Sequence, residues 1–484
     1  MKKYTSTVFL KSFVDSYFDL FLSITIALFG IYIFYPGAMS GDSVNQWYQV
    51  TNPEMISSWF PPSMVYLWIV LNKITYGPQG MLIFQYIILN LSIWLLARIF
   101  YHRVIHRVIF ICFICFFPPI FFITGVIWKD VSVFVSLSMS FALLFKFELN
   151  RKKIFLLLSI LFFIYTISVR HNSVVCLLPY IIYILSILIK SSISKKTILI
   201  TILTPIFFYG GVKLSNFLIH GIVKKENVVH HMENATFIWD LWGMSVELNK
   251  NIIPEYVFSD TGRLLTIEQL KRLYEPYTCS IIYLPHINPY RCTDNADKFP
   301  DKIFKKDFIR LILKYPAAYL KVRSRLVLYM LGIKWPVPHV PAIVAFEFNI
   351  YKPSDKQDVL YEPSKHLEMR HKIAMEKSFY VAYWFLMKTY LYRVWVYIVL
   401  IILQLVAAIS YKAYLGDSYR RIVLILSIGL IYWFPYIIIS TSSDFRFSIP
   451  TVYCGIIALP LLIHRIFSYH KNIFSSRKMP LLHS

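Results

Sequence analysis

Residues 108–147 read VIFICFICFFPPIFFITGVIWKDVSVFVSLSMSFALLFKF, and this stretch decides the class of the fold. From residue 108 to residue 145 the only charged residues are the neighbours Lys129 and Asp130. The apolar runs on either side of this pair are long enough to cross the hydrocarbon core of a bilayer. We therefore expect two membrane-spanning helices here, joined by a very short turn that carries the two charges.

The same pattern recurs along the 484-residue chain, 57% of which is hydrophobic. It predicts an all-α polytopic membrane protein with about ten transmembrane helices. The first apolar run lacks a small-residue cleavage site, so we expect a retained helix rather than a signal peptide. The predicted spans are 17–36, 80–100, 108–127, 131–147, 154–169, 173–189, 197–214, 391–411, 421–440 and 449–467.

The formal net charge of +24 reports membrane topology rather than nucleic-acid binding. Segment 215–380 holds 18 of the 26 acidic and 23 of the 50 basic residues, a balance of +5, which leaves +19 for the rest of the chain. Most of that excess lies in short loops and tails, as the positive-inside rule predicts for cytoplasmic segments. We therefore expect contact with anionic membrane lipid and no nucleic-acid partner.

One topology puts every basic loop on the cytoplasmic side. The chain then divides into an N-terminal transmembrane module (1–214, seven spans), a mainly helical extracytoplasmic domain (215–390) and a C-terminal module (391–484, three spans and a basic tail). Within the first outer loop, 37–79, the apolar stretch Ser63 to Tyr76 is too short to span and is predicted to be an interfacial or re-entrant helix. The remaining outward segments are 128–130, 170–172 and 441–448.

The six cysteines fall into two groups. Those inside apolar spans are expected to act as small buried hydrophobic residues. Cys279 and Cys292 both lie in the outer segment, where an oxidising compartment would favour a disulfide between them. Two unpaired thiols are the alternative. The cysteines of the first group are Cys112, Cys115, Cys176 and Cys454.

Four polar motifs lie at the outward ends of the predicted spans. Three of them combine a cation with a polar neighbour at a junction between spans, a pattern that favours phosphate binding because guanidinium and ammonium groups are the usual phosphate ligands. The alternative is that these cations anchor the helices to headgroups and that their neighbours cap helices. The motifs are Gly41-Asp42-Ser43, Trp128-Lys129-Asp130, Arg170-His171-Asn172 and Asp444-Phe445-Arg446.

Asp42 is the first candidate for a catalytic group. At a membrane boundary, among apolar neighbours, we expect its pKa to be raised, which would suit a general base that removes a proton from a sugar hydroxyl. The alternative is that Asp42 caps a helix that starts near Val44. No Walker loop, dinucleotide fingerprint or His-Glu-x-x-His zinc motif occurs in the sequence. A sugar donor on the outer side of the membrane would therefore have to be linked to lipid.

These motifs resemble those of the GT-C class of polytopic glycosyltransferases, which use polyprenyl-phosphate sugars, and most closely the serotype-converting O-antigen glucosyltransferases. The resemblance covers the pattern of spans and about twenty motif residues, including Pro61-Pro62 and the extension of the last motif to Pro450. Segment 215–380 does not contribute to it. The chain also differs from many GT-C enzymes, because its large outer domain precedes the last three predicted spans instead of following them.

The resemblance implies transfer of a hexose, with glucose the expected sugar, from undecaprenyl phosphate to an acceptor glycan such as the O-antigen of lipopolysaccharide. The enzyme would lie in the bacterial cytoplasmic (inner) membrane with its active site facing the periplasm. Asp42 would be the catalytic base, and Lys129, Arg170 and Arg446 would contact the donor phosphate. Residues expected to line the site are Asp130, His171, Asn172, Asp444, Gln46 and Trp47.

No cofactor follows from the resemblance, although a divalent cation (Mg or Mn) remains possible, and no metal ligands are assigned. Some GT-C enzymes carry a second acidic residue in the first outer loop, close in sequence to the catalytic one. Glu54 is the candidate here, but its spacing from Asp42 does not match the spacing in those enzymes.

Three other functions stay open. An O-antigen polymerase would use arginines of the outer segment, such as Arg323 and Arg325, and would leave Asp42 dispensable. A lipid-linked sugar flippase or transporter would carry charged or Gly/Pro-broken positions near the midplane of its helices. A structural membrane protein would use its outward charges only as anchors.

Overall fold

The computed structural model describes residues 2–189, 193–228, 232–258, 265–278, 300–334 and 385–477. Within these ranges every regular element is a helix, and a single isolated β-bridge joins Ala38 to Val126. The all-α prediction is therefore confirmed for the described part of the chain. Cys279 and Cys292 lie outside the described residues, so their disulfide remains a prediction.

In the described part of the chain, seven helical segments are long and apolar enough to cross a membrane, which makes this a polytopic helical membrane protein. Each of them overlaps one of the spans predicted from the sequence. The seven are Tyr17–Phe34 in α1 (Lys2–Phe34), α4 (Gln79–Phe100), α7 (Lys129–Asn150), His171–Leu188 in η2 (His171–Cys176) and α9 (Leu177–Leu188), Lys195–Gly221 in α10 (Ile193–Asn216) and η3 (Phe217–Gly221), Asp417–Ile439 in α18 (Asp417–Trp433) and α19 (Tyr436–Ile439), and Phe445–Phe467 in η10 (Phe445–Ser448) and α20 (Ile449–Arg477).

The other three predicted spans differ from these seven. The prediction of one continuous helix over 108–127 is wrong: α5 (Val104–Cys115) and α6 (Pro118–Thr124) meet at an angle of 63°. The break falls at Phe116-Phe117, directly before Pro118 and Pro119, which have no amide hydrogen to continue α5. By contrast, α8 (Lys153–Val169) and α16 (Val394–Ser410) are continuous apolar helices of 17 residues each.

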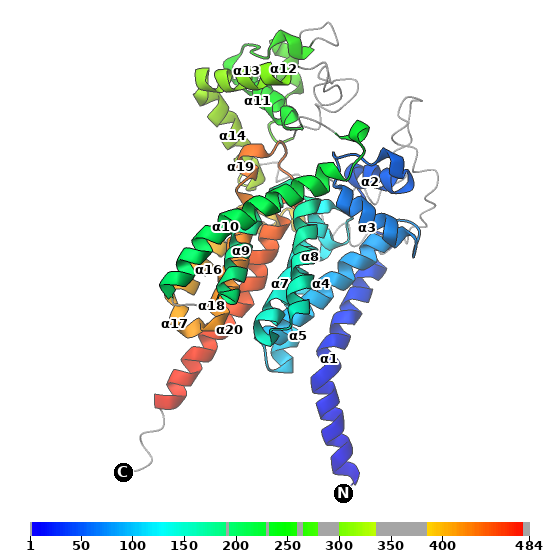
Figure 1. Cartoon of the computed structure of the whole chain (residues 1–484), viewed down its shortest axis with the longest axis vertical. Coiled ribbons are helices and arrows are strands. Elements are labelled where there is room, and N and C mark those ends of the chain that lie inside the picture. Colours follow the sequence, from blue (N-terminus) through cyan, green and yellow to red (C-terminus); the bar gives the residue numbers. More distant parts are fainter. Residues whose placement is uncertain are drawn as a thin grey trace.

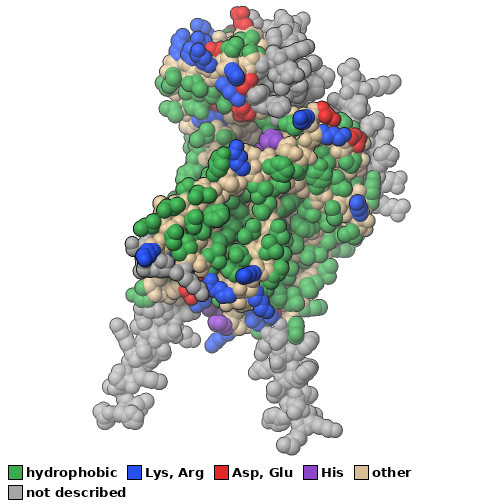
Figure 2. Space-filling view, viewed as in Figure 1, with side chains coloured by type: hydrophobic (Ala, Val, Ile, Leu, Met, Phe, Trp, Pro, Cys, Tyr) green, Lys and Arg blue, Asp and Glu red, His purple; other side chains and the backbone are tan. Residues whose placement is uncertain are grey.

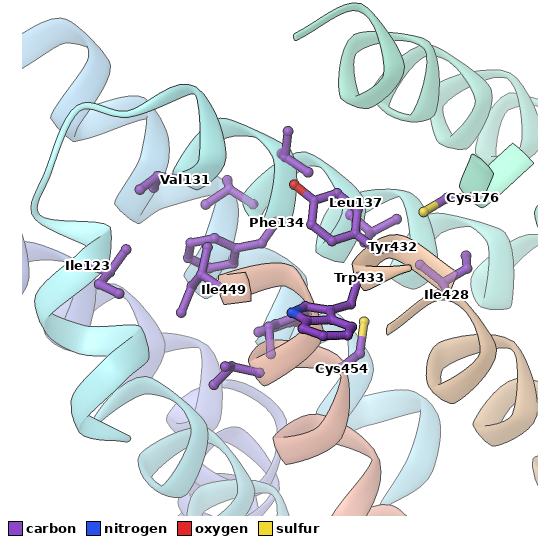
Figure 3. Packing of buried hydrophobic residues seen from close by; sticks show 14 of the residues in the cluster. Ile123, Val131, Phe134, Leu137, Cys176, Ile428, Tyr432, Trp433, Ile449 and Cys454 are labelled. Atoms are coloured by element: carbon purple, nitrogen blue, oxygen red, sulfur yellow. The ribbon is translucent and has the colours of Figure 1, made fainter. Parts of the chain in front are cut away.

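Helix α7 lies at the centre of the bundle, and 94% of its span is buried. It packs against α4, α8 and α20. Figure 3 shows Phe134 of α7 near Ile449 of α20, and Cys454 of α20 beside Trp433 of α18. Four buried serines on α7 let neighbouring backbones approach closely and satisfy their hydroxyls with other helices, as in the contact of Ser136 with Thr166 of α8. This packing fixes the axial position of Lys129 and Asp130, the first two residues of α7.

The helices of the outer segment lie at only one of the two ends of the bundle. Helix α1 begins and α20 ends at one end of the bundle, and the helices of the outer segment lie at the other, above α10 and α19 (Figure 1). Hydrophobic side chains cover the middle of the visible face, whereas charged side chains gather toward its two ends (Figure 2). The helices of the outer segment are α11 (Glu233–Leu248), α12 (Ile267–Leu273), α13 (Asp301–Lys314) and α14 (Pro316–Met330).

The first outer loop folds into two short helices, α2 (Gly41–Thr51) and α3 (Pro62–Asn72). With 11 residues, α3 is too short to cross a bilayer, and its interfacial or re-entrant placement stays a prediction. Trp47 and Trp68 are both buried, and their rings pack together at 5.4 Å between centroids, which holds α2 against α3.

Gly30 marks the closest approach of α1 to α4. A Cβ at this position would overlap the ring of Tyr86, which is buried and donates a hydrogen bond to the Phe121 carbonyl at 3.1 Å. The ring therefore has little room to move. We expect Gly30→Ala to destabilise the protein by about 1–3 kcal/mol, the usual effect of overpacking, and so to lower its melting temperature in detergent.

The matched control for this substitution is Gly210→Ala on α10, where no atom lies within 4 Å of the added Cβ. This variant should melt at or slightly above the temperature of the wild type, since Ala favours a helix. Equal melting temperatures for the two variants would contradict close packing of α1 on α4.

Candidate functional site

Backbone hydrogen bonds attach the first outer loop to the segment that leads into α7. The Ala38 amide donates to the Gly125 carbonyl at 3.0 Å, and the Ile127 amide donates to the Ala38 carbonyl at 2.7 Å. The Trp128 indole then donates to Ser40 Oγ at 2.8 Å. These contacts bring the motif around Asp42 next to the motif around Lys129, although the two are far apart in sequence.

Arg446 connects three of the four motifs. Its guanidinium forms an ion pair with Asp42 at 2.8 Å and with Asp444 at 3.2 Å, and it lies over the ring of Trp128 at 5.0 Å. Its side chain is 11% exposed, so the pair with Asp42 is shielded from water on the arginine side. The first outer loop is thereby tied to the turn before α20.

Arg170 connects the remaining motif. Its guanidinium contacts Asp130 at 2.6 Å and donates from Nε to the Tyr436 hydroxyl at 2.7 Å. The rings of Phe447 and Tyr436 lie 4.6 and 5.4 Å from it. All four polar motifs therefore meet at one end of the bundle, as the sequence predicts.

The environment of Asp42 differs from the prediction. We expected apolar surroundings to raise the pKa of Asp42, but its pKa lies below the usual value of 3.8. Burial alone would raise the pKa, but it is outweighed by the positive charges of Arg446, Lys129 and Arg170 together with the hydrogen bond from Arg446. The side chain is 40% exposed, so Asp42 is an ionised carboxylate that incoming molecules can reach.

The alternative role of Asp42 as a helix cap does not fit the structure. Helix α2 begins at Gly41, and its N-cap is Ser40, which forms a capping box with Ser43. Asp42 lies in the first turn, where the helix dipole favours a negative charge, but its side chain is directed to Arg446.

A pocket of about 170 Å³ lies beside this network. Lys129 lines this pocket. Among the described residues Lys129 forms no ion pair, whereas Arg170 and Arg446 both do. Lys129 is therefore the one cation of the predicted phosphate set that is free to bind an anion from outside the described chain. The pocket is lined by Ser58, Trp59, Pro61, Lys129, Ser168, Val169, Arg170, His171, Asn172 and Ile219.

The other predicted site residues occupy different places. His171 and Asn172 line the pocket, and Asp130 and Asp444 are buried in ion pairs with arginines. Gln46 and Trp47 are only 1% and 2% exposed and do not line the pocket, so their role is packing within the first outer loop.

Sequence reasoning missed six residues of the site, namely Ser58, Trp59, Ser168, Val169, Ile219 and Tyr436. Trp59 and Ser58 line the pocket from the segment between α2 and α3, and Tyr436 binds Arg170 from α19. No pattern in the sequence distinguishes these residues from other aromatic, aliphatic and small residues near span ends. The folding of the first outer loop brings Ser58 and Trp59 to the pocket, whereas Tyr436 reaches Arg170 from α19.

The charges of the site do not favour a metal ion. Asp42, Asp130 and Asp444 are each ion-paired to an arginine, and no group of three or more His, Cys, Asp or Glu side chains suited to a metal occurs in the described ranges. The possibility of Mg or Mn stays a prediction that this geometry does not support.

No family model, no curated protein and no solved structure matches this chain. The argument for a function therefore rests on the chemistry of the site.

Proposed function

We propose that this protein is an integral-membrane glycosyltransferase of the GT-C type. It would move a hexose, with glucose the expected sugar, from undecaprenyl phosphate to a surface glycan such as O-antigen on the periplasmic face of a bacterial inner membrane. One observation carries the proposal: at the end of the bundle that bears the helices of the outer segment, a pocket contains a lysine that forms no ion pair with any described residue, and this pocket lies beside an accessible, ionised carboxylate.

The proposed reaction requires little from the protein. The oxygen of an acceptor hydroxyl attacks the anomeric carbon, the bond from that carbon to the phosphate oxygen breaks, and the lipid phosphate leaves with the bonding electrons. Lys129 neutralises the charge that develops on the phosphate. Asp42 accepts the proton of the hydroxyl. Although its lowered pKa makes it a weak base, the hydroxyl becomes strongly acidic as the new bond forms, so a weak base suffices.

The pairing of the two arginines modifies the roles that the resemblance implies. Arg446 holds Asp42, and Arg170 holds Asp130, so each contributes to the site mainly by fixing a carboxylate. The donor phosphate then binds chiefly to Lys129, with Asn172 and Ser168 as further polar groups of the pocket. In this proposal the chain has about ten spans, with α5–α6, α8 and α16 added to the seven longer helices.

A polymerase that uses Arg323 and Arg325 for substrate binding is disfavoured. Arg323 is buried and paired with Asp240, and Arg325 is paired with Glu247, so neither guanidinium is free to bind a substrate. We expect Arg325→Gln to leave the amount of transferred sugar and the length of the surface glycan unchanged, because the substitution removes only a partly exposed ion pair. Gel electrophoresis of the extracted polysaccharide checks this, and shortened chains of intact repeats would favour the polymerase.

The direct test uses the purified, membrane-embedded protein. The protein is reconstituted into liposomes with a radiolabelled polyprenyl-phosphate hexose and a lipid-linked acceptor glycan, and the product is identified by mass spectrometry. Donors that carry glucose, galactose and mannose are compared, with the nucleotide-linked sugars as controls. Transfer from a lipid-linked donor and none from a nucleotide sugar is the expected result. Absence of transfer from every donor to every acceptor would remove the proposal.

A further inference from the structure

The outer domain contacts the rest of the chain at several places, such as the hydrogen bond from the Trp395 amide to the Leu331 carbonyl, and one of these contacts involves the short segment before α20. This segment, Ile439–Ser443, leads directly into Asp444 and Arg446, the residues that form the ion-pair network with Asp42. We call it the connector. Three groups of the outer domain bind it: Thr236 Oγ1 donates to the Ile439 carbonyl at 3.4 Å, Arg323 Nη1 donates to the Ser440 carbonyl at 2.6 Å, and the Tyr277 carbonyl accepts from the Ser443 amide at 2.9 Å.

Arg323 makes the strongest of these contacts. It extends from α14 and divides its guanidinium between two partners: Nη2 binds the carboxylate of Asp240 on α11, and Nη1 binds the connector. The side chains of Arg323 and Asp240 are 6% and 1% exposed. A hydrogen bond from a charged donor in such a buried place holds its acceptor firmly.

The same guanidinium lies between aromatic rings. Trp239 and Tyr319 are 5.8 and 6.0 Å from it, which restricts its movement. Arg323 thus has a fixed position in the outer domain, set by residues of α11 and α14. Its position in turn fixes the Ser440 carbonyl, four residues before Asp444.

We propose that Arg323 is a positioning residue, which holds the connector so that Arg446 stays against Asp42. This inference rests on the proposed function, because it assigns Arg323 a part in the proposed transfer. Loss of the contact to Ser440 would let the connector shift, and displacement of a reacting group by about 1 Å can lower a rate by about 10²-fold. The proposal also explains why a charged group is buried far from the substrate pocket.

The experiment compares three variants in reconstituted liposomes. Arg323→Lys keeps the charge but lacks the planar fork that reaches Asp240 and Ser440 together. The double variant Asp240→Leu with Arg323→Met replaces the buried pair by apolar groups of similar size, which usually keeps a protein folded. Asp240→Asn is the matched control, because its amide oxygen can still accept from Nη2 while Nη1 keeps its bond to Ser440.

The first readout is kinetic. We expect a fall in kcat of about 10- to 100-fold for Arg323→Lys and for the double variant, with the donor KM little changed, and a kcat near the wild-type value for Asp240→Asn. The acid side of the pH profile should also move to higher pH in the first two variants. The reason is that a displaced Arg446 no longer lowers the pKa of Asp42, so Asp42 becomes protonated at a higher pH. A merely structural defect would not shift the acid side of the pH profile.

The second readout needs no enzymatic activity. Ser443 is fully buried in the connector, so Ser443→Cys should react slowly with a membrane-impermeant maleimide in otherwise wild-type protein. Adding Arg323→Lys should accelerate the labelling, whereas adding Asp240→Asn should not. Each rate is compared with that of the same variant without Ser443→Cys, which removes the contribution of the natural cysteines.

The two readouts separate the two proposals. If the wild type transfers no sugar, the proposed function fails, and the labelling still tests whether Arg323 holds the connector. Unchanged labelling in Arg323→Lys overturns the inference, and so does faster labelling with an unchanged kcat in an active enzyme. An equal loss of kcat in Asp240→Asn also overturns it, because that result would assign the effect to the ion pair and not to the contact with Ser440.

Discussion

Asp42→Asn should lower the rate of sugar transfer by about 10²- to 10⁴-fold, the range that a positioned general base contributes. The amide has nearly the same shape as the carboxylate but accepts no proton at neutral pH and forms no ion pair with Arg446. In cells that depend on this protein, mass spectrometry of the surface polysaccharide should show each repeat one sugar short. Membrane expression of the variant is measured in parallel.

The matched control for Asp42→Asn is Glu54→Gln, which neutralises an exposed residue of the same outer loop at the 3₁₀ turn Pro53–Met55. It should leave the glycan complete. An unchanged glycan with normally expressed Asp42→Asn would contradict the assignment of Asp42 as the base. Shortened chains of intact repeats would point to a polymerase.

The pH dependence of transfer follows from the same carboxylate. Because the pKa of Asp42 lies below the usual 3.8, the ionised form that accepts a proton predominates at that pH and above and is lost only as the pH falls further. We therefore expect no loss of the wild-type rate from this group between neutral pH and about pH 5. A raised pKa, as expected from apolar surroundings alone, would instead have reduced the rate within that interval.

Lys129→Met should weaken the use of the lipid-phosphate donor by about 10- to 100-fold in kcat/KM. This range corresponds to the loss of one hydrogen bond to a charged group, about 1.5–3 kcal/mol. Methionine fills a similar volume, so the pocket keeps its shape, but the cation that faces it is lost. The effect should be large because the other two cations of the site are already paired with carboxylates. Donor titrations with reconstituted protein measure it.

The control for Lys129→Met is Lys213→Met, which removes an exposed lysine of α10 that lies over the ring of Tyr209. It should leave kcat/KM unchanged. If the two variants lost equal affinity for the donor, the effect would come from general attraction of the anionic lipid and not from the pocket. If neither variant lost affinity, the phosphate would bind elsewhere.

Most of the helical pattern could be predicted from the sequence, since a backbone in lipid must satisfy its own hydrogen bonds and does so in long apolar helices. The predicted spans overlap all seven long apolar helices, and a short helix lies at residues 62–72 as expected. The break directly before Pro118 and Pro119 was missed because hydropathy continues through it, whereas the two prolines interrupt the helix.

The sequence by itself determined which charged residues lie at the ends of the apolar helices, because charged groups avoid the hydrocarbon core and therefore collect at its boundary. Only the tertiary structure decided how these groups pair. Arg446 reaches Asp42 from the opposite end of the chain, and Arg170 takes Asp130, which leaves Lys129 to face the pocket. Ion pairing depends on distances of a few ångströms between distant segments, and these distances are set by the packing of α7 against its neighbours. For the same reason the lowered pKa of Asp42 could not be predicted from its neighbours in sequence.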